Sequence, residues 1–297
     1  MHLQRLITGL LRSMRPRQWS KNLVVFAALV FDSKLFQAQP SLHSVYGFIV
    51  LCLLSSAVYL INDSADAAAD RQHPTKRNRP IARSDVPVPV ALAYAGLLIV
   101  VSLLFAWSVN WRFALIGAAY FALTTAYTFK LKHIVILDVL ILATGFVLRV
   151  AAGTILVVAE RFSPWLYVCM SLLALLMAFG KRRQELIELG GKTSTRAILS
   201  EYSVPLLDQI ISIVTGALIV SYTFYTFSAP QLPSNHSMML SIPFVLYGLF
   251  RYLYLVIVKG EGGAPDELAL KDRPLQLTVV LWGLVCAAVL YLVPRVT

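Results

Sequence analysis

The chain has 297 residues, of which 58% are apolar and only 14% are charged, and its mean hydropathy is +0.71. Soluble domains carry roughly half apolar and about a quarter charged residues, so this composition excludes an ordinary soluble protein and a disordered one. The 26 lysines and arginines exceed the 15 aspartates and glutamates and give a net charge of +11. Because these charges lie in short stretches between apolar runs, they are typical of membrane-protein loops, and no nucleic-acid partner is expected.

Residues 1–18 predict an amphipathic helix that lies on the membrane surface. Apolar residues such as Leu6 and Leu10 recur there at helical spacing, opposite a series of arginines. Because Arg5 and Arg12 interrupt the apolar run, no cleaved signal peptide is expected.

Nine apolar segments are long enough to cross the hydrocarbon core of a bilayer, which takes about 20 residues. They are predicted at 22–36, 44–62, 87–108, 111–129, 134–158, 164–180, 204–227, 240–258 and 274–293. If the N-terminus is cytoplasmic, most basic residues fall in four predicted cytoplasmic loops, 63–86, 130–133, 181–203 and 259–273. The expected fold is therefore a single all-α transmembrane domain over 1–297, a bundle in the bacterial inner membrane whose active-site mouth faces the cytoplasm.

Four polar residues follow one another at the cytoplasmic end of the second segment. Asn62, Asp66 and Asp70 are four residues apart, and Asp63 lies on the same side of a helix. The alanine-rich sequence between them favours one continuous helix. Carboxylates at this spacing repel one another, so a cation must compensate them. Hard oxygen ligands suit Mg²⁺, which commonly bridges carboxylates to the phosphates of a substrate.

A basic segment comes directly after this acidic motif. Pro74 ends the helix and leaves Lys76, Arg77 and Arg79 on a short loop that could fold back over a metal-bound diphosphate. Two simpler explanations stay open. The aspartates could pair with Arg71 and its basic neighbours on a solvated helix end, or the cations could only mark the cytoplasmic side.

The pattern Asn-Asp-x-x-Asp-x-x-x-Asp, in a basic chain of this length with nine spans, resembles the UbiA superfamily of intramembrane prenyltransferases. The resemblance covers nearly the whole chain. It implies that Mg²⁺, with Mn²⁺ as an alternative ion, and a diphosphate are held by Asn62, Asp63, Asp66 and Asp70.

Two further segments, 15–22 and 73–81, look like one branch of this superfamily, the decaprenyl-phosphate phosphoribosyltransferases. That resemblance implies phosphoribosyl pyrophosphate as the donor and a polyprenyl phosphate lipid as the acceptor. It also implies a place in the synthesis of a polyprenyl-linked arabinose precursor. Lys21, Lys76 and Arg79 are then expected to bind substrate.

The chain departs from the superfamily members that use aromatic acceptors, which carry a second aspartate-rich motif after the sixth span. Here Lys181, Arg182 and Arg183 occupy that position, followed by Glu185. Cations in place of metal-binding acids suit substrates with additional phosphate groups. Lys181, Arg182 and Glu185 are therefore predicted to bind substrate. A topological marker, or a simple pair between Arg182 and Glu185 on one helix, stays an alternative.

A third element resembles the family's tyrosine and lysine followed by an aspartate. Tyr127 is expected to bind substrate, and Lys132 and Asp138 are expected to act in catalysis together with the two later aspartates of the acidic motif, Asp66 and Asp70. A carboxylate inside a span is costly in lipid, so Asp138 is predicted to face the bundle interior. Structural and ligand-binding roles are equally open for Arg149 and Arg251, which lie within predicted spans.

The predicted reaction transfers a phosphoribosyl group to the lipid phosphate and releases diphosphate. Its nucleophile is already ionised at neutral pH, so no general base is needed. A prenyltransferase that moves an isoprenoid onto an aromatic acceptor is the first alternative, and a transporter for a phosphorylated solute is the second. A homo-oligomer is left open.

Overall fold

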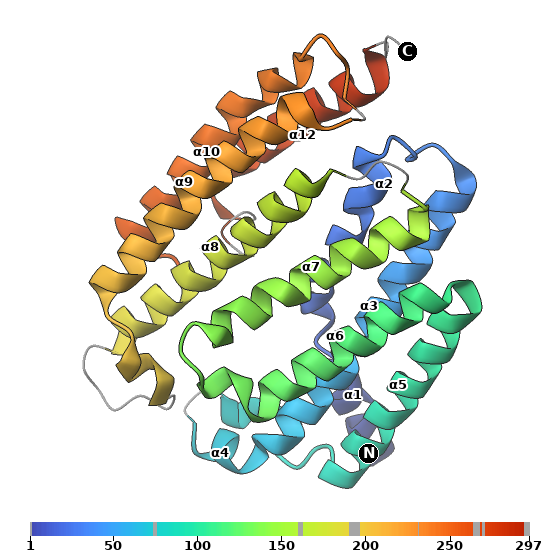
Figure 1. Cartoon of the computed structure of the whole chain (residues 1–297). Helices are drawn as coiled ribbons and strands as arrows, with labels where there is room; N and C mark the ends of the chain where they lie inside the picture. The colour runs from blue at the N-terminus through green and yellow to red at the C-terminus, as the bar shows by residue number, and fades with distance from the viewer. Residues whose placement is uncertain are drawn as a thin grey trace. The chain divides into compact units, whose positions relative to one another are not determined.

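The structure is a computed structural model. It describes residues 2–73, 76–159, 163–189, 197–230, 232–263, 268 and 271–293. Every regular element in these ranges is a helix, and no strand occurs among them (Figure 1). The all-α class predicted from composition is therefore confirmed. Parts of three predicted loops, 63–86, 181–203 and 259–273, lie outside the described residues.

The chain divides into two compact units. Unit 1 comprises Met1–Leu29, Lys34–Lys130 and Leu148–Ala159, and unit 2 comprises Val30–Ser33, Leu131–Val147 and Glu160–Thr297. Two helices contribute residues to both units, namely α2 (Ala27–Phe31) and α7 (Leu137–Val157).

The other elements belong to one unit each. Unit 1 contains α1 (His2–Ser13), the 3₁₀ helix η1 (Pro16–Phe26), α3 (Ala38–Ala65), α4 (Ala67–Gln72), η2 (Lys76–Asn78), α5 (Val88–Val109) and α6 (Trp111–Phe129). Unit 2 contains η3 (Leu131–His133), α8 (Pro164–Leu189), η4 (Ala197–Glu201), α9 (Val204–Ser228), η5 (Ser237–Ser241), α10 (Ile242–Ile257) and α12 (Arg273–Leu292).

Seven helical segments in the described ranges are long and apolar enough to cross a membrane. They match seven of the nine predicted spans: α3, α5, α7, α8, α9, η5 with α10, and α12. The prediction of one span over 22–36 is wrong as a continuous helix, because the 3₁₀ helix η1 runs to Phe26 and α2 has only five residues. Asp32 and Lys34 end the apolar run there. Helix α6, which matches the predicted span 111–129, is long enough to cross a membrane. It is not among the seven apolar segments, because Arg112 and its threonines and tyrosines lower its mean hydropathy.

Helix α8 continues to Leu189, beyond the predicted end of its span at residue 180. Lysine, arginine, glutamine, glutamate and leucine are all good helix formers, and they make up most of this extension. The first part of the predicted loop 181–203 is therefore helical. The basic cluster after the sixth predicted span consequently lies on a regular helix, where the burial of each residue depends on the side of α8 it faces.

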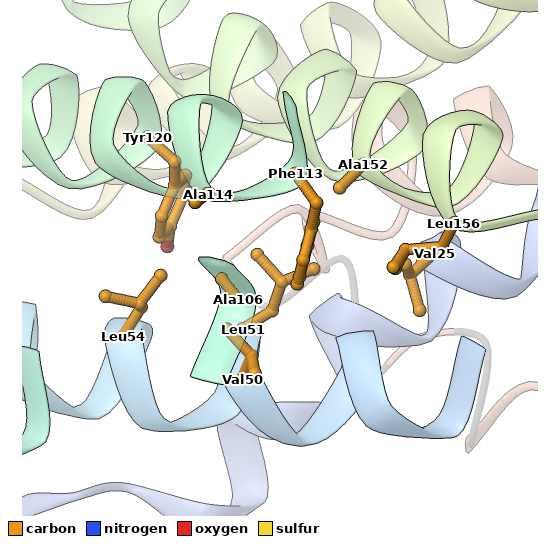
Figure 2. Packing of buried hydrophobic residues seen from close by; sticks show 10 residues of the cluster. All are labelled: Val25, Val50, Leu51, Leu54, Ala106, Phe113, Ala114, Tyr120, Ala152 and Leu156. Carbon is orange, nitrogen blue, oxygen red and sulfur yellow. The ribbon is translucent and has the colours of Figure 1, made fainter. Parts of the chain in front are cut away.

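The core of unit 1 lies where α3, α5, α6 and the second half of α7 meet. Leu51 and Leu54 of α3 and Phe113 of α6 are completely buried, and Leu156 of α7 packs in the same cluster (Figure 2). Val25 of η1 completes this core. The irregular first segment is thus held by packing against the long helices of its unit.

Gly153 allows α7 to approach the backbone of η1 closely. A Cβ atom at this position would lie 2.1 Å from the carbonyl oxygen of Val25. We expect Gly153→Ala to destabilise the protein by at least about 1–3 kcal/mol, because backbone must move to relieve the overlap. Gly96→Ala is the control, since nothing lies within 4 Å of its Cβ position, and alanine has the better helix propensity. Thermal unfolding in detergent measures both variants, and equal melting temperatures would contradict the close approach.

In unit 2, a polar network joins α9 to η5 and α12. The Tyr222 hydroxyl lies 2.6 Å from the Ser241 hydroxyl and accepts a hydrogen bond of 2.8 Å from the Trp282 indole. Tyr222 is 6% exposed. This network satisfies a buried tyrosine hydroxyl away from the basic end of α8.

Candidate active site

The acidic motif lies at a break between two helices and not on one continuous helix. Helix α3 ends at Ala65, and α4 begins at Ala67. Asp66 stands between them with φ −88° and ψ 0°, outside the helical region. The backbone N–H of Asp66 still donates to the carbonyl of Asn62, and that of Asp70 donates to the carbonyl of Asp66. The prediction of an unbroken helix is therefore wrong, although the turn keeps the motif compact.

Two of the predicted metal ligands share one arginine. Arg79 donates from one guanidinium nitrogen to Asp63, at 3.0 Å, and to Asp70, at 2.7 Å. The two carboxylate side chains are only 3% and 5% exposed. Asp63 also accepts a 2.5 Å hydrogen bond from Arg15. We call Asp63, Asp70, Arg15 and Arg79 the aspartate cluster.

Arg15 belongs to this cluster although the sequence analysis assigned it no role. It has a left-handed backbone with φ 54° directly before Pro16, and its guanidinium lies 4.7 Å from the ring centroid of Tyr59. A non-glycine residue in this conformation is uncommon and needs support from its surroundings. Its only signal in the sequence was its place at the start of segment 15–22, which resembles the phosphoribosyltransferase branch.

The aspartate cluster fits a divalent cation by the chemistry of its donors. Mg²⁺ needs one or two protein carboxylates and takes its other ligands from water and substrate phosphates. Asp63 and Asp70 are close enough to bind the same cationic nitrogen, so they can supply the two carboxylates. Within the described ranges, no group of three or more His, Cys, Asp or Glu side chains is arranged to hold a metal by itself.

The other predicted site residues of unit 1 are all half-buried. Asn62 and Asp66 adjoin the aspartate cluster in the chain, and Lys21, Lys76 and Tyr127 lie in η1, η2 and the last turn of α6. Such partly exposed polar side chains are accessible to a ligand.

A second group of charged residues lies in unit 2. Arg182 of α8 donates to Asp138 of α7 at 2.8 Å and to Glu185 at 2.6 Å. Asp138 is 0% exposed and Arg182 is 4% exposed. The prediction that Asp138 faces the interior is confirmed. Arg182 and Glu185 do form the pair that was the alternative to substrate binding, and their predicted role in substrate binding stays a prediction. We call Asp138, Arg182, Glu185 and Tyr202 the Asp138 cluster.

Tyr202 is the member of the Asp138 cluster that the sequence analysis missed. It follows η4, is 5% exposed, and donates to Asp138 at 2.8 Å. Burial, and next the hydrogen bond to Asp138, raise the pKa of Tyr202 to about 12. No sequence motif marks this tyrosine, because its partners are distant in the chain.

Neighbouring cations differ in burial. Lys181 is exposed on α8, whereas Arg182 is buried, because adjacent residues of a helix point about 100° apart. Arg183 is also buried and donates to Asp208 of α9 at 2.6 Å. Lys132, in η3, is half-buried. Of the two cations on α8 that are predicted to bind phosphate, Lys181 is therefore exposed, whereas Arg182 is buried and bonded to Asp138 and Glu185.

The two arginines inside spans have structural contacts. Arg149 donates to Asn22 of η1 and to Tyr120 of α6, both at 2.8 Å, and thereby joins three helices of unit 1. Arg251 of α10 donates twice to Asp272, the residue that caps α12, at 3.2 and 2.8 Å. These contacts favour the structural alternative for both residues.

Comparison with known proteins places the chain in a family. The model described as the UbiA prenyltransferase family matches residues 23–265. A decaprenyl-phosphate phosphoribosyltransferase of Mycolicibacterium smegmatis is 38% identical over 309 aligned residues, which cover 96% of this chain and 94% of that protein. A decaprenyl-phosphate phosphoribosyltransferase of Corynebacterium glutamicum is 33% identical, over 97% of this chain and 89% of that protein.

Solved structures agree at the level of the fold. A UbiA homolog from Archaeoglobus fulgidus bound to GPP and Mg²⁺ has a TM-score of 0.73 with this chain at 18% identity, over 95% of this chain and 99% of that one. The matched family model spans most of the sequence, and the relatives are similar over nearly their whole lengths. The chain is a member of the UbiA prenyltransferase family.

Proposed function

We propose that this protein transfers the 5-phosphoribosyl group of phosphoribosyl pyrophosphate to a polyprenyl phosphate of the decaprenyl type and releases diphosphate. The observation that carries this proposal is the similarity, over nearly the whole chain, to decaprenyl-phosphate phosphoribosyltransferases. The cations on α8 support it, because Lys181 and Arg182 stand where aromatic-acceptor members have metal-binding acids.

The aspartate cluster is the proposed binding site for the metal and the leaving diphosphate. Asp63 and Asp70, with Asn62 and Asp66 beside them, would hold Mg²⁺, or Mn²⁺ as an alternative. The ion supplies stabilisation of negative charge on the leaving diphosphate. Arg79 donates to both carboxylates and is therefore close to the proposed metal site. We propose that Arg79, together with Lys76, binds the negatively charged oxygens of the leaving diphosphate.

The bond changes need no protein base. The bond between ribosyl C1 and the diphosphate oxygen breaks, and a bond forms between C1 and a phosphate oxygen of the lipid. That oxygen is ionised at neutral pH, so no proton must be removed. The protein's task is to position the phosphates and to stabilise the developing charge. We propose that Lys21, Lys132 and Lys181 hold phosphate oxygens, and that Tyr127 helps to orient the donor.

Membrane placement follows from the same proposal. The apolar helices are those of a multi-pass membrane protein, and we propose the bacterial inner membrane with a cytoplasmic N-terminus, because basic residues concentrate between alternate spans. A water-soluble donor would then reach the site from the cytoplasm, and the lipid would enter from the bilayer.

A product assay tests the proposed function. Purified protein in lipid nanodiscs is incubated with Mg²⁺, polyprenyl phosphate and phosphoribosyl pyrophosphate, and the lipid is examined by mass spectrometry. We expect the lipid to gain the mass of one phosphoribosyl group, with one diphosphate released per product. A parallel reaction contains a prenyl diphosphate and an aromatic acceptor. Product only in that reaction would support the prenyltransferase alternative and overturn the proposal.

A further inference from the structure

The hydroxyl of Tyr202 makes two hydrogen bonds to residues around the start of α7 in unit 2. It donates to Asp138 at 2.8 Å and accepts a 2.7 Å hydrogen bond from the backbone N–H of Ile136. Ile136 lies in the turn that leads from η3 into α7, and Asp138 lies in the first turn of α7. Tyr202 itself follows η4, so these two bonds connect segments that are far apart in the sequence.

The turn held by Tyr202 is strained. Ile136 has φ 67°, a left-handed backbone conformation that is rare for a β-branched residue and persists only where its surroundings enforce it. Lys132 lies in η3, directly before this turn. The backbone N–H of Ile134 donates to the carbonyl of Leu131 at 3.3 Å, and the N–H of Asp138 donates to the carbonyl of Ile134 at 3.0 Å. A hydrogen bond to the Ile136 amide therefore helps to fix the position of Lys132.

The bond from Tyr202 to Asp138 is connected to α8 through a third residue, Arg182. Asp138 uses one carboxylate oxygen for Tyr202 and the other for Arg182. Arg182 is in turn paired with Glu185. A continuous series of contacts therefore connects Tyr202, through Asp138, to the basic end of α8. Asp138, Arg182 and Tyr202 are each at most 5% exposed, so water does not readily replace a hydrogen bond that is lost between them.

We propose that Tyr202 is a positioning residue for phosphoribosyl transfer, which ties the turn directly after Lys132 to the cations of α8. This inference rests on the proposed function, because it assigns the fixed geometry to the binding of the donor's phosphates. Tyr202 acts through Lys132 and the α8 cations, so it is not itself a catalytic residue.

The protonation state of Tyr202 agrees with this role. Its pKa is raised to about 12 by burial and by the bond to Asp138. The hydroxyl therefore remains a donor throughout the range in which the enzyme would be assayed, and it does not contribute a titration near neutral pH.

The test compares Tyr202→Phe with Tyr222→Phe in the full-length protein. Both changes delete one hydroxyl from a buried network of unit 2, and Tyr222 lies roughly 27 Å along α9 from its start at Val204, at 1.5 Å per residue. We expect both variants to lose thermal stability. Only Tyr202→Phe should raise KM for phosphoribosyl pyrophosphate, by about tenfold or more, because its phosphate-binding groups are no longer fixed. Unchanged KM in Tyr202→Phe, or an equal rise in Tyr222→Phe, would overturn the proposal.

Hydrogen exchange separates this inference from the proposed function. In Tyr202→Phe, peptides covering 131–138 and 181–189 should both exchange faster than in the wild type, while Tyr222→Phe leaves both unchanged. This result supports the coupling between the two segments whether or not the protein transfers a phosphoribosyl group. If the product assay shows no such transfer, the proposed function is wrong, and the role of Tyr202 in donor binding is wrong with it. Faster exchange in 131–138 alone would show that Tyr202 does not act on α8, and the coupling would then be wrong.

Discussion

Asp70→Asn and Asp66→Asn are each expected to lower kcat/KM for phosphoribosyl transfer by about 10³ or more. Each change replaces a charged oxygen ligand by a weaker neutral one, and loss of metal-based charge stabilisation costs several kcal/mol of the barrier. Folding should persist, because Arg79 keeps its contact with Asp63 when Asp70 is changed. Activity is measured against Mg²⁺ concentration, with melting temperature recorded for each variant.

Asp85→Asn is the matched control for these two variants. Asp85 lies in the same predicted cytoplasmic segment and is paired only with the exposed Arg83 among the contacts described for it, at 3.4 Å. Surface pairs of this kind contribute about 0–1 kcal/mol, so activity should match the wild type. Near-normal Mg²⁺-dependent activity in either Asp66→Asn or Asp70→Asn would show that the acidic motif does not hold the metal as proposed.

A second, independent prediction concerns the titration of Tyr202. Its folded pKa of about 12 lies above the ordinary value of 10.0, so the buried neutral hydroxyl contributes stability that is fully present below pH 10. That contribution is lost as the pH rises from 10 through 12. We expect the melting temperature of the wild type to fall more steeply over this range than that of Tyr202→Phe. Parallel curves for the two proteins would contradict the burial of this hydroxyl.

The sequence predicted the helices of this protein far better than the breaks in them. Long apolar runs fix the spans, since burial in lipid outweighs local preferences. The break at Asp66 was not predicted, because alanine-rich sequence favours helix and the contacts of Arg15 and Arg79 that hold the turn come from other elements. The irregular η1 was missed for a similar reason: Val25 packs in the core of unit 1 although η1 is not an α-helix.

The candidate site was predictable where its chemistry is local in sequence. Asp63 and Asp70 belong to one motif, and the pair of Arg182 with Glu185 follows from helical spacing. The hydrogen bonds that Asp138 accepts from Arg182 and Tyr202 join residues that are 44 and 64 positions apart in the sequence. No periodicity indicates such contacts, so the structure was needed to distinguish the buried Arg182 from the exposed Lys181.

This difference in burial gives Lys181→Ala and Arg182→Ala different expected effects. Lys181→Ala should leave stability within about 0.5 kcal/mol, because the side chain is exposed. If Lys181 binds a phosphate, the lost charge-assisted hydrogen bond costs about 1.5–3 kcal/mol, or roughly ten- to a hundredfold in kcat/KM. Arg182→Ala leaves the buried Asp138 without its ion-pair partner and should destabilise the protein by about 3–5 kcal/mol in addition to reducing activity.

The measurements are melting temperature and kcat/KM, with phosphoribosyl pyrophosphate and polyprenyl phosphate varied separately. Lys259→Ala is the control, since Lys259 is also an exposed lysine near the end of a predicted span in unit 2, and it should be silent in both measurements. If the α8 cations were only a topological marker, Lys181→Ala would be as silent as Lys259→Ala. That result would remove the argument that cations replace a second metal site, because a lysine that contacts a transferred or leaving phosphate cannot be deleted without raising the barrier.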